Sequence, residues 1–123
     1  HTADAEEKAL HFMQSALTLY LQFVPENHSS LSSTYNNIGS VYHAMKDEAN
    51  ALISHQAALN CQLAADEPDV NAIIVYYHNI ATIYEALRKF DDALENYQKA
   101  LELQRQFLGE DHPDIADTYR AMA

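Results

Sequence analysis

The sequence has few of the residues that interrupt regular structure, with two glycines and three prolines among 123 residues. Together with 48% apolar residues, this scarcity argues against disorder and favours a chain rich in helix. The single cysteine, Cys61, excludes an internal disulfide and is compatible with a reducing compartment. No apolar run reaches the roughly 18 residues of a membrane span, and no signal-like start is present. We therefore expect a cytoplasmic location.

Basic residues are also scarce. Seven Lys and Arg stand against eighteen Asp and Glu, which gives a formal net charge of −11. Nucleic acids and anionic membranes both require a positive surface, so neither is expected as a partner. A protein or peptide partner with a neutral or basic segment is favoured, although an acidic balance is also typical of a surface that is only solvated.

Catalytic and metal-binding motifs are absent from the sequence as well. It contains no Gly-rich phosphate loop, no Gly-x-Ser-x-Gly and no His-Glu-x-x-His, so we expect neither an enzyme nor a cofactor. The seven histidines include no pair three or four residues apart, so no metal site is expected. We expect His55 to be a packing residue and His28 and His112 to lie in turns.

What the sequence does contain is a 42-residue repeat. Shifting residues 35–62 onto 77–104 gives eleven identities: Tyr35/Tyr77, Asn37/Asn79, Ile38/Ile80, Tyr42/Tyr84, Ala44/Ala86, Ala51/Ala93, Leu52/Leu94, Gln56/Gln98, Ala58/Ala100, Leu59/Leu101 and Gln62/Gln104. A fixed period of this size is typical of units that bury their apolar faces by stacking on one another. The same shift extends to both ends, so we expect the chain to begin in the second helix of one unit and to end in the first helix of another.

Apolar periodicity predicts helices near 4–23, 31–45, 48–65, 69–87, 90–108 and 114–123. The pattern is clearest in one stripe, which continues to Phe107 and comprises Phe90, Ala93, Leu94, Tyr97, Ala100, Leu101 and Gln104. Proline and acidic residues at 67–69 and 110–114 mark the starts of helices, and Gly109 marks an end. Short connections predict antiparallel neighbours.

Each helix pair carries a recurring motif. The first helix reads Tyr-x-x-Ile-Gly/Ala-x-x-Tyr from Tyr35 and from Tyr77, and the second reads Ala-x-x-x-His/Tyr-x-x-Ala from Ala51 and from Ala93. Residues 108–114 read Leu-Gly-Glu-Asp-His-Pro-Asp. These motifs resemble the tetratricopeptide repeat of the long variety found in kinesin light chains. The resemblance implies an all-α fold in which antiparallel helix-turn-helix repeats stack as a right-handed solenoid.

The resemblance also implies an organisation of the chain as one solenoid fragment, residues 1–123. Residues 1–30 would hold the second helix of a truncated repeat, 31–66 and 67–109 two complete repeats, and 110–123 the first helix of another truncated repeat.

In such arrays the first helices line a concave groove that holds an extended peptide, and the resemblance implies the same function here. Away from the apolar stripe, the first helices carry mostly uncharged polar residues: Asn36, Asn37, Ser40, His43, His78, Asn79, Thr82 and Glu85. Because an amide both donates and accepts, Asn37 and Asn79 are the pair expected to hold a peptide backbone. The alternative is that these amides are solvated or bond within their own turn. Since Arg120 is the only basic residue near this face, a carboxylate clamp is not expected.

A structural role is the alternative function. The array would then act as a scaffold or spacer that self-associates end to end through apolar stripes at its two ends. These stripes are Ala9, Leu10, Met13 and Leu17 at one end and Ile115, Tyr119 and Met122 at the other.

Overall fold

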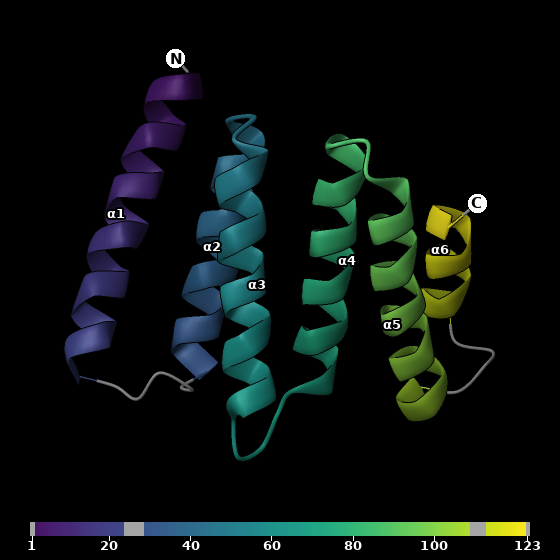
Figure 1. Ribbon diagram of the computed structural model, residues 1–123. Coiled ribbons are helices and arrows are strands. Elements are labelled where there is room, and N and C mark those ends of the chain that lie inside the picture. Colours follow the sequence, from purple (N-terminus) through teal and green to yellow (C-terminus); the bar gives the residue numbers. More distant parts are fainter. Residues whose placement is uncertain (1, 24–28, 109–112, 123) are drawn as a thin grey trace. The chain divides into compact units, whose positions relative to one another are not determined.

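The computed structural model describes residues 2–23, 29–108 and 113–122, and in these ranges it contains α-helices and no strand (Figure 1). The helices in chain order are α1 Thr2–Phe23, α2 Ser29–Ala44, α3 Glu48–Ala64, α4 Val70–Ala86, α5 Phe90–Leu108 and α6 Pro113–Met122. The chain forms two compact units, His1–Pro68 with α1 to α3 and Asp69–Ala123 with α4 to α6. In the described ranges no helix combines the length and the apolar character needed to cross a membrane.

All the helices expected from the sequence are present, and each end lies within two residues of the prediction. Asp47 and Asp69 define two of the starts, because their carboxylates accept the backbone N–H of Asn50 and Ala72, respectively, at 3.3 Å. Such N-caps satisfy one of the backbone donors that a helix start leaves unpaired. The turn histidines predicted at 28 and 112 and the stop at 109 lie outside the described residues.

The turns inside the two hairpins have the same backbone structure. Lys46 and Arg88, 42 residues apart, both have positive φ, at 68° and 64°. In the first turn the Asp47 amide donates to the Tyr42 carbonyl at 2.9 Å, and in the second the Lys89 amide donates to the Tyr84 carbonyl at 2.8 Å. A hydrogen bond that spans six residues in this way is characteristic of the Schellman motif, in which a helix ends at a residue of left-handed conformation. The 42-residue repeat therefore includes the backbone conformation of the turn that joins the two helices of each hairpin.

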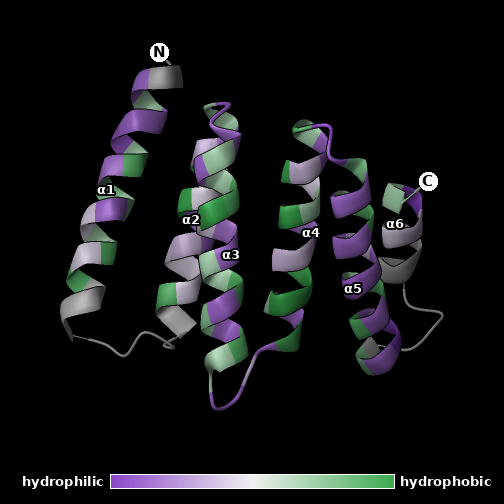
Figure 2. Cartoon of the chain, in the orientation of Figure 1, coloured by the Kyte–Doolittle hydropathy of each residue, from purple (hydrophilic) through white to green (hydrophobic). Residues whose placement is uncertain are grey.

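Small residues let the paired helices approach closely within each unit. The alanines of the second-helix motif are almost completely buried: Ala51 and Ala58 on α3, and Ala93 and Ala100 on α5, are 0–3% exposed. They pack where α3 meets α2 and where α5 meets α4. Figure 2 shows α4 to be largely hydrophobic and α5 largely hydrophilic on the side in view. The core of each unit thus lies along the line where its two hairpin helices meet.

Part of the predicted α5 stripe is not buried. Phe90 and Phe107 are 57% and 55% exposed and Leu94 is 39% exposed, whereas Tyr97 and Leu101 are buried as expected. Ala93, the neighbour of Leu94, is nevertheless buried in a cluster against which Met122 of α6 packs. α6 thus reaches the start of α5 and still leaves Phe90 and Leu94 exposed.

The predicted stripe on α1 is half-buried rather than exposed. Ala9, Leu10, Met13 and Leu17 lie at intermediate burial on the helix that packs against α2. The exposed large apolar side chains of α1 are Phe12 and Leu19, at 76% and 57% exposure. They lie seven residues apart and so share one exposed face of the helix.

The tightest contact in the first unit is between Gly39 on α2 and His55 on α3. A Cβ atom added at Gly39 would lie 2.8–2.9 Å from three atoms of the imidazole ring. At the equivalent positions of the second unit, Ala81 and Tyr97 are both buried. His55, 2% exposed, is thus confirmed as a packing residue.

We expect Gly39→Leu to lower the free energy of unfolding by about 1–3 kcal/mol, because the added side chain overpacks the site. Thermal or urea unfolding measures the change. A double-mutant cycle with His55→Ala tests the same contact more sharply. Gly39→Ala should destabilise the wild-type chain, where the ring is present. In the His55→Ala chain it should stabilise the fold by up to about 1 kcal/mol, because alanine has the higher helix propensity. An equal effect of Gly39→Ala in both backgrounds would show that the His55 ring does not limit the size of the side chain at position 39.

We expect Lys46→Gly and Arg88→Gly each to stabilise the chain by about 0.5–1 kcal/mol, because glycine adopts positive φ without the clash of a Cβ. Lys46→Val should destabilise it, since a β-branched side chain resists this conformation. Chemical denaturation of the three variants tests whether the positive φ of Lys46 and Arg88 costs stability. Gln56→Gly, in the exposed interior of α3, is the control and should cost about 1 kcal/mol.

Candidate functional site

The eight residues predicted to bind a peptide divide between two faces of the first helices, α2 and α4. One residue set contacts neighbouring helices of its own unit: Asn36 and His43 on α2, and His78 and Glu85 on α4. The other set lies on a more open face, where Asn37, Ser40 and Thr82 are exposed and Asn79 is half-buried. The two sets therefore lie in different surroundings.

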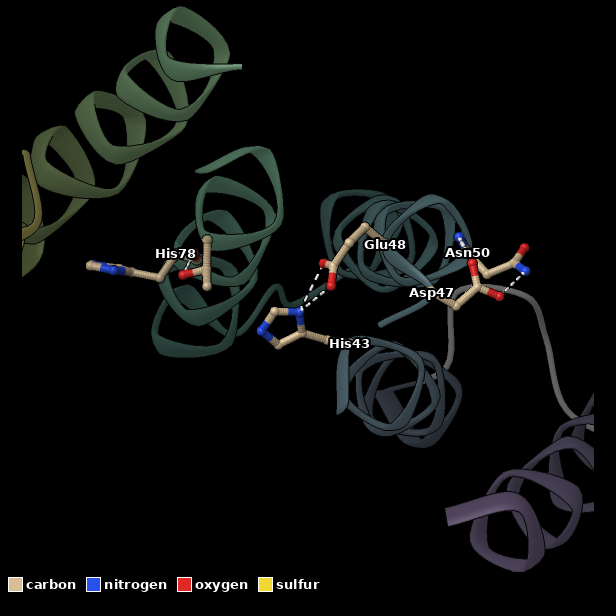
Figure 3. Close-up of polar contacts among 6 residues, drawn as sticks. His43, Asp47, Glu48, Asn50 and His78 are labelled. Atoms are coloured by element: carbon tan, nitrogen blue, oxygen red, sulfur yellow. Dashed lines mark hydrogen bonds and ion pairs between the residues drawn. The ribbon is translucent and has the colours of Figure 1, made fainter. Parts of the chain in front are cut away.

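In the first unit, both inward residues bond to α3. The Nδ1 atom of His55 lies 2.9 Å from Oδ1 of Asn36, so a proton on Nδ1 is donated to the amide oxygen. His43 lies 2.8 Å from a carboxylate oxygen of Glu48, the first residue of α3 (Figure 3). The polar groups of Asn36 and His43 thus hold the two hairpin helices together.

The second unit repeats this arrangement with different chemistry. The ring of His78 meets the ring of Tyr97 edge to face, with centroids 5.4 Å apart, and the Tyr97 hydroxyl donates to Glu85. His78 Nε2 also lies 2.9 Å from the hydroxyl oxygen of Thr118 on α6, which is fully buried. His78 and Tyr97 occupy the positions of Asn36 and His55 one period later. The same pair of positions therefore joins first and second helix in both units.

Burial shifts the proton affinity of both central rings. Desolvation, with a smaller contribution from the charge of His43, lowers the pKa of His55 from 6.5 to about 4. Burial, and then the hydrogen bond to Glu85, raises the pKa of Tyr97. Both shifts favour the neutral form, so both rings are uncharged at neutral pH and act as packing and hydrogen-bonding groups.

The open face of each first helix carries a row of residues spaced four, three and four apart, which places them on one side of a helix. We call this row the outer stripe; it consists of Ser33, Asn37, Ser40 and Ala44 on α2 and of Val75, Asn79, Thr82 and Ala86 on α4. All members are exposed except the half-buried Asn79, and none is charged. The stripe thus offers small uncharged side chains in both units.

Two hydroxyl groups of the outer stripes have matching bonds. Ser40 donates to the carbonyl of Asn36 at 3.2 Å, and Thr82 donates to the carbonyl of His78 at 3.0 Å. A hydroxyl that donates its proton keeps lone pairs that can accept from a ligand. Sequence reasoning missed Ser33, Ala44, Val75 and Ala86, although the helical spacing around Asn37 and Asn79 was a signal that pointed to them.

Two surface hollows lie away from the outer stripes. One, of about 580 Å³, runs along α1 and is lined by Asp4, Glu7, Lys8, His11, Phe12 and Ser15. The other, of about 670 Å³, is lined by Gln98, Leu101, Glu102, Arg105 and Gln106 of α5 and by Met122 of α6. Within the described ranges no three His, Cys, Asp or Glu side chains are placed to hold a metal ion.

The sequence matches two family models, both described as tetratricopeptide repeat, over residues 32–60 and 72–123. The chain belongs to the tetratricopeptide repeat family. Arrays of this family are protein-interaction and scaffold modules, and this chain is such a module. No match was found among curated protein sequences.

Solved structures confirm the fold. The crystal structure of BtubC (BKLC) from P. vanneervenii matches with a TM-score of 0.86 and 18% identity, covering 97% of this chain and 48% of that one. Two crystal structures of a Podosopora anserina putative kinesin light chain with nearly identical TPR-like repeats match with TM-scores of 0.83 and 0.82. For both, the identity is 14% and the match covers 98% of this chain and 57% of the other. This tetratricopeptide array therefore has the long, kinesin-light-chain-like repeat that the sequence predicts, and it spans about half the length of these structures.

We expect acid to destabilise the first unit through His55. Its pKa is lower in the folded than in the unfolded chain, so the unfolded chain binds more protons between about pH 6.5 and pH 4. The contribution of His55 to stability is complete above pH 6.5 and is lost as the pH falls through this interval, by at most about 3 kcal/mol. Urea unfolding at pH 7, 5.5 and 4.5 measures the loss.

His55→Gln is the control for this titration, because glutamine keeps a hydrogen-bonding group and does not titrate. The wild-type chain should lose more stability than the variant over this range. If the unfolding free energies of the two chains fell in parallel with pH, protonation of His55 would not destabilise the fold.

Proposed function

We propose that this tetratricopeptide array is a non-catalytic module that binds an extended peptide or partner segment along the outer stripe of each unit. The supporting observation is that the stripe recurs in both units with the same character, uncharged and largely exposed, on a chain whose net charge is −11. In this proposal the complete repeats are residues 31–66 and 67–109. The proposed location is the cytoplasm, with which a single cysteine, Cys61, is compatible.

The small side chains of the outer stripe allow a partner backbone to come close to the helix. Asn37 and Asn79 stand second in their stripes, and each amide can donate to a carbonyl and accept from an N–H of the partner. Val75, 47% exposed, lies one turn before Asn79 and adds an apolar contact. Main-chain recognition of this kind depends on hydrogen bonds and requires no charge on the partner.

Charge outside the stripes favours a neutral or basic partner. Residues 1–68 contain eight acidic and two basic residues, and residues 69–123 contain ten and five, so the units carry −6 and −5. An acidic surface of this kind raises the association rate of basic segments more than it raises their affinity. The same charge disfavours nucleic acids and anionic membranes.

The test is to select peptides from a random phage-displayed library on the immobilised chain and to measure the affinity of the selected peptide. Asn37→Ala combined with Asn79→Ala should weaken binding at least tenfold, because each lost bidentate amide contact costs about 1 kcal/mol or more. The unfolding free energy is measured beside the affinity; it should change little for Asn37→Ala, since Asn37 is exposed.

Gln56→Ala combined with Gln98→Ala is the matched control. These glutamines are exposed, equivalent by the 42-residue period and located on the second helices. Binding should survive their replacement. Loss of binding with the glutamine pair, together with full binding by the asparagine pair, would refute the outer stripes as the recognition surface.

A second candidate function is that of a scaffold segment that associates with copies of itself. The observation that favours it is the exposure of large apolar side chains on α1, where Phe12 and Leu19 are 76% and 57% exposed.

A further inference from the structure

The end of α4 carries a charge that is unfavourable for a helix. Its last turn contains Glu85 and no basic residue, whereas the last turn of α2 has His43 at the equivalent repeat position. The C-terminal end of a helix has a partial negative charge, so a carboxylate there is disfavoured and a cation is favoured. Glu85 is exposed, and none of the Lys and Arg side chains in the described ranges forms an ion pair with it, including Arg88 and Lys89 in the following turn.

In the first unit the carboxylate near the same place has a basic partner within the chain. Glu48 lies 2.8 Å from His43 (Figure 3). The repeat position of Glu48 is occupied in the second unit by Phe90, which cannot form an ion pair. The two units therefore differ at one pair of positions. The carboxylate is balanced in the first unit, and among the described residues it is not balanced in the second.

A hydrogen bond orients the Glu85 carboxylate. The hydroxyl of Tyr97, a residue that is 5% exposed, donates to Oε1 of Glu85. An ionised carboxylate has acceptor lone pairs on both oxygens, so this bond does not use up its capacity. A side chain that is already oriented loses less conformational entropy when a ligand binds to it. Glu85 is thus suited to receive a Lys or Arg side chain of a partner.

Val75 gives the opposite end of the α4 outer stripe an apolar character. It is 47% exposed, and its repeat position in the first unit is occupied by Ser33. Glu85 follows Thr82, a member of the stripe, by three residues and so borders the stripe at its other end. Val75 and Glu85 are ten residues apart, which is about 15 Å along a helix and equals about four or five residues of an extended chain.

We propose that the outer stripe of α4 selects a partner segment with a Lys or Arg side chain at Glu85 and an apolar side chain at Val75, about four or five residues apart. Charge complementarity identifies this occupant, because the second unit carries −5 and has a carboxylate without a cation at this place. The α2 stripe, with Ser33 and a balanced carboxylate, makes neither selection. The inference rests on the proposed peptide binding and names the side chains that the peptide must bring.

The test begins with the peptides that the wild-type chain selects from a random phage-displayed library. They should contain a basic and an apolar residue at the stated spacing. Fluorescence anisotropy then measures the affinity of one selected peptide and of the same peptide with glutamine in place of its basic residue. Glu85→Gln should weaken binding of the basic peptide about fivefold, as for a favourable exposed ion pair, and leave binding of the neutral peptide unchanged. The difference should shrink as the salt concentration rises.

The stability of the free chain separates recognition from a structural role. Glu85→Gln should raise the thermal midpoint slightly, because glutamine still accepts from Tyr97 and a negative charge leaves the negative end of α4. Asp92→Asn is the matched control, since it removes the same charge from an exposed position in the first turn of α5, where an acid is favourable. It should lower the midpoint and leave both peptide affinities unchanged.

Val75→Ser tests the apolar end of the stripe. It should weaken binding of the selected peptide by about threefold to fivefold, because an apolar contact is lost. Ile53→Ser makes a similar change at an exposed position of α3, a second helix, and should leave the affinity unchanged.

Selected peptides without a basic residue would overturn the inference, and so would an unchanged affinity of Val75→Ser. Equal weakening of the basic and neutral peptides by Glu85→Gln would also overturn it, because Glu85 would then act through the fold. If affinity depends on the asparagine pair of the outer stripes but not on Glu85 or Val75, the proposed function stands and the inference fails. If the chain selects no peptide at all, both fail.

Discussion

The close approach of two helices at small residues is the constraint on which the rest of this structure depends. Ala51 and Ala58 in the first hairpin, and Ala93 and Ala100 in the second, are almost completely buried on helices that pack against the first helix of their own repeat. Because the two helices lie close together, the one large ring between them fits only beside a residue without a bulky side chain. His55 therefore requires glycine at position 39, and Tyr97 lies opposite alanine at position 81.

This packing also divides each first helix into two faces with different surroundings. Residues one position apart on a helix differ by about 100° in direction, so neighbours such as Asn36 and Asn37 face different surroundings. Asn36 bonds to His55 in the hairpin interface, while Asn37 remains exposed. The interface needs polar groups that satisfy one another, whereas the outer stripe consists of uncharged groups that are largely exposed. The proposed function therefore rests on residues other than those that join the two hairpin helices.

Sequence reasoning predicted the helices well because two independent periodicities agree. The 42-residue identities define the unit, and the helical spacing of apolar residues defines the elements within it. The hairpin turns escaped prediction in detail, since Lys46 and Arg88 take a conformation for which glycine is the usual signal. Exposure of Phe90 and Leu94 also escaped it, because apolar spacing does not show which part of a stripe a neighbouring helix covers. Among the candidate binding residues, Asn36, His43, His78 and Glu85 fit the family pattern, but their contacts with the adjoining helices require coordinates to be seen.

Native-state hydrogen exchange measures most directly whether paired helices joined at small residues are the structural units of this protein. The backbone amides of α2 and α3 should open together, with one common free energy, and those of α4 and α5 should do the same, because neither helix of a pair can bury its apolar side alone. The amides of α1 and α6, which lack a hairpin partner in the described chain, should exchange at lower free energy. Independent opening of α2 and α3, with protection of one surviving the loss of the other, would contradict this account.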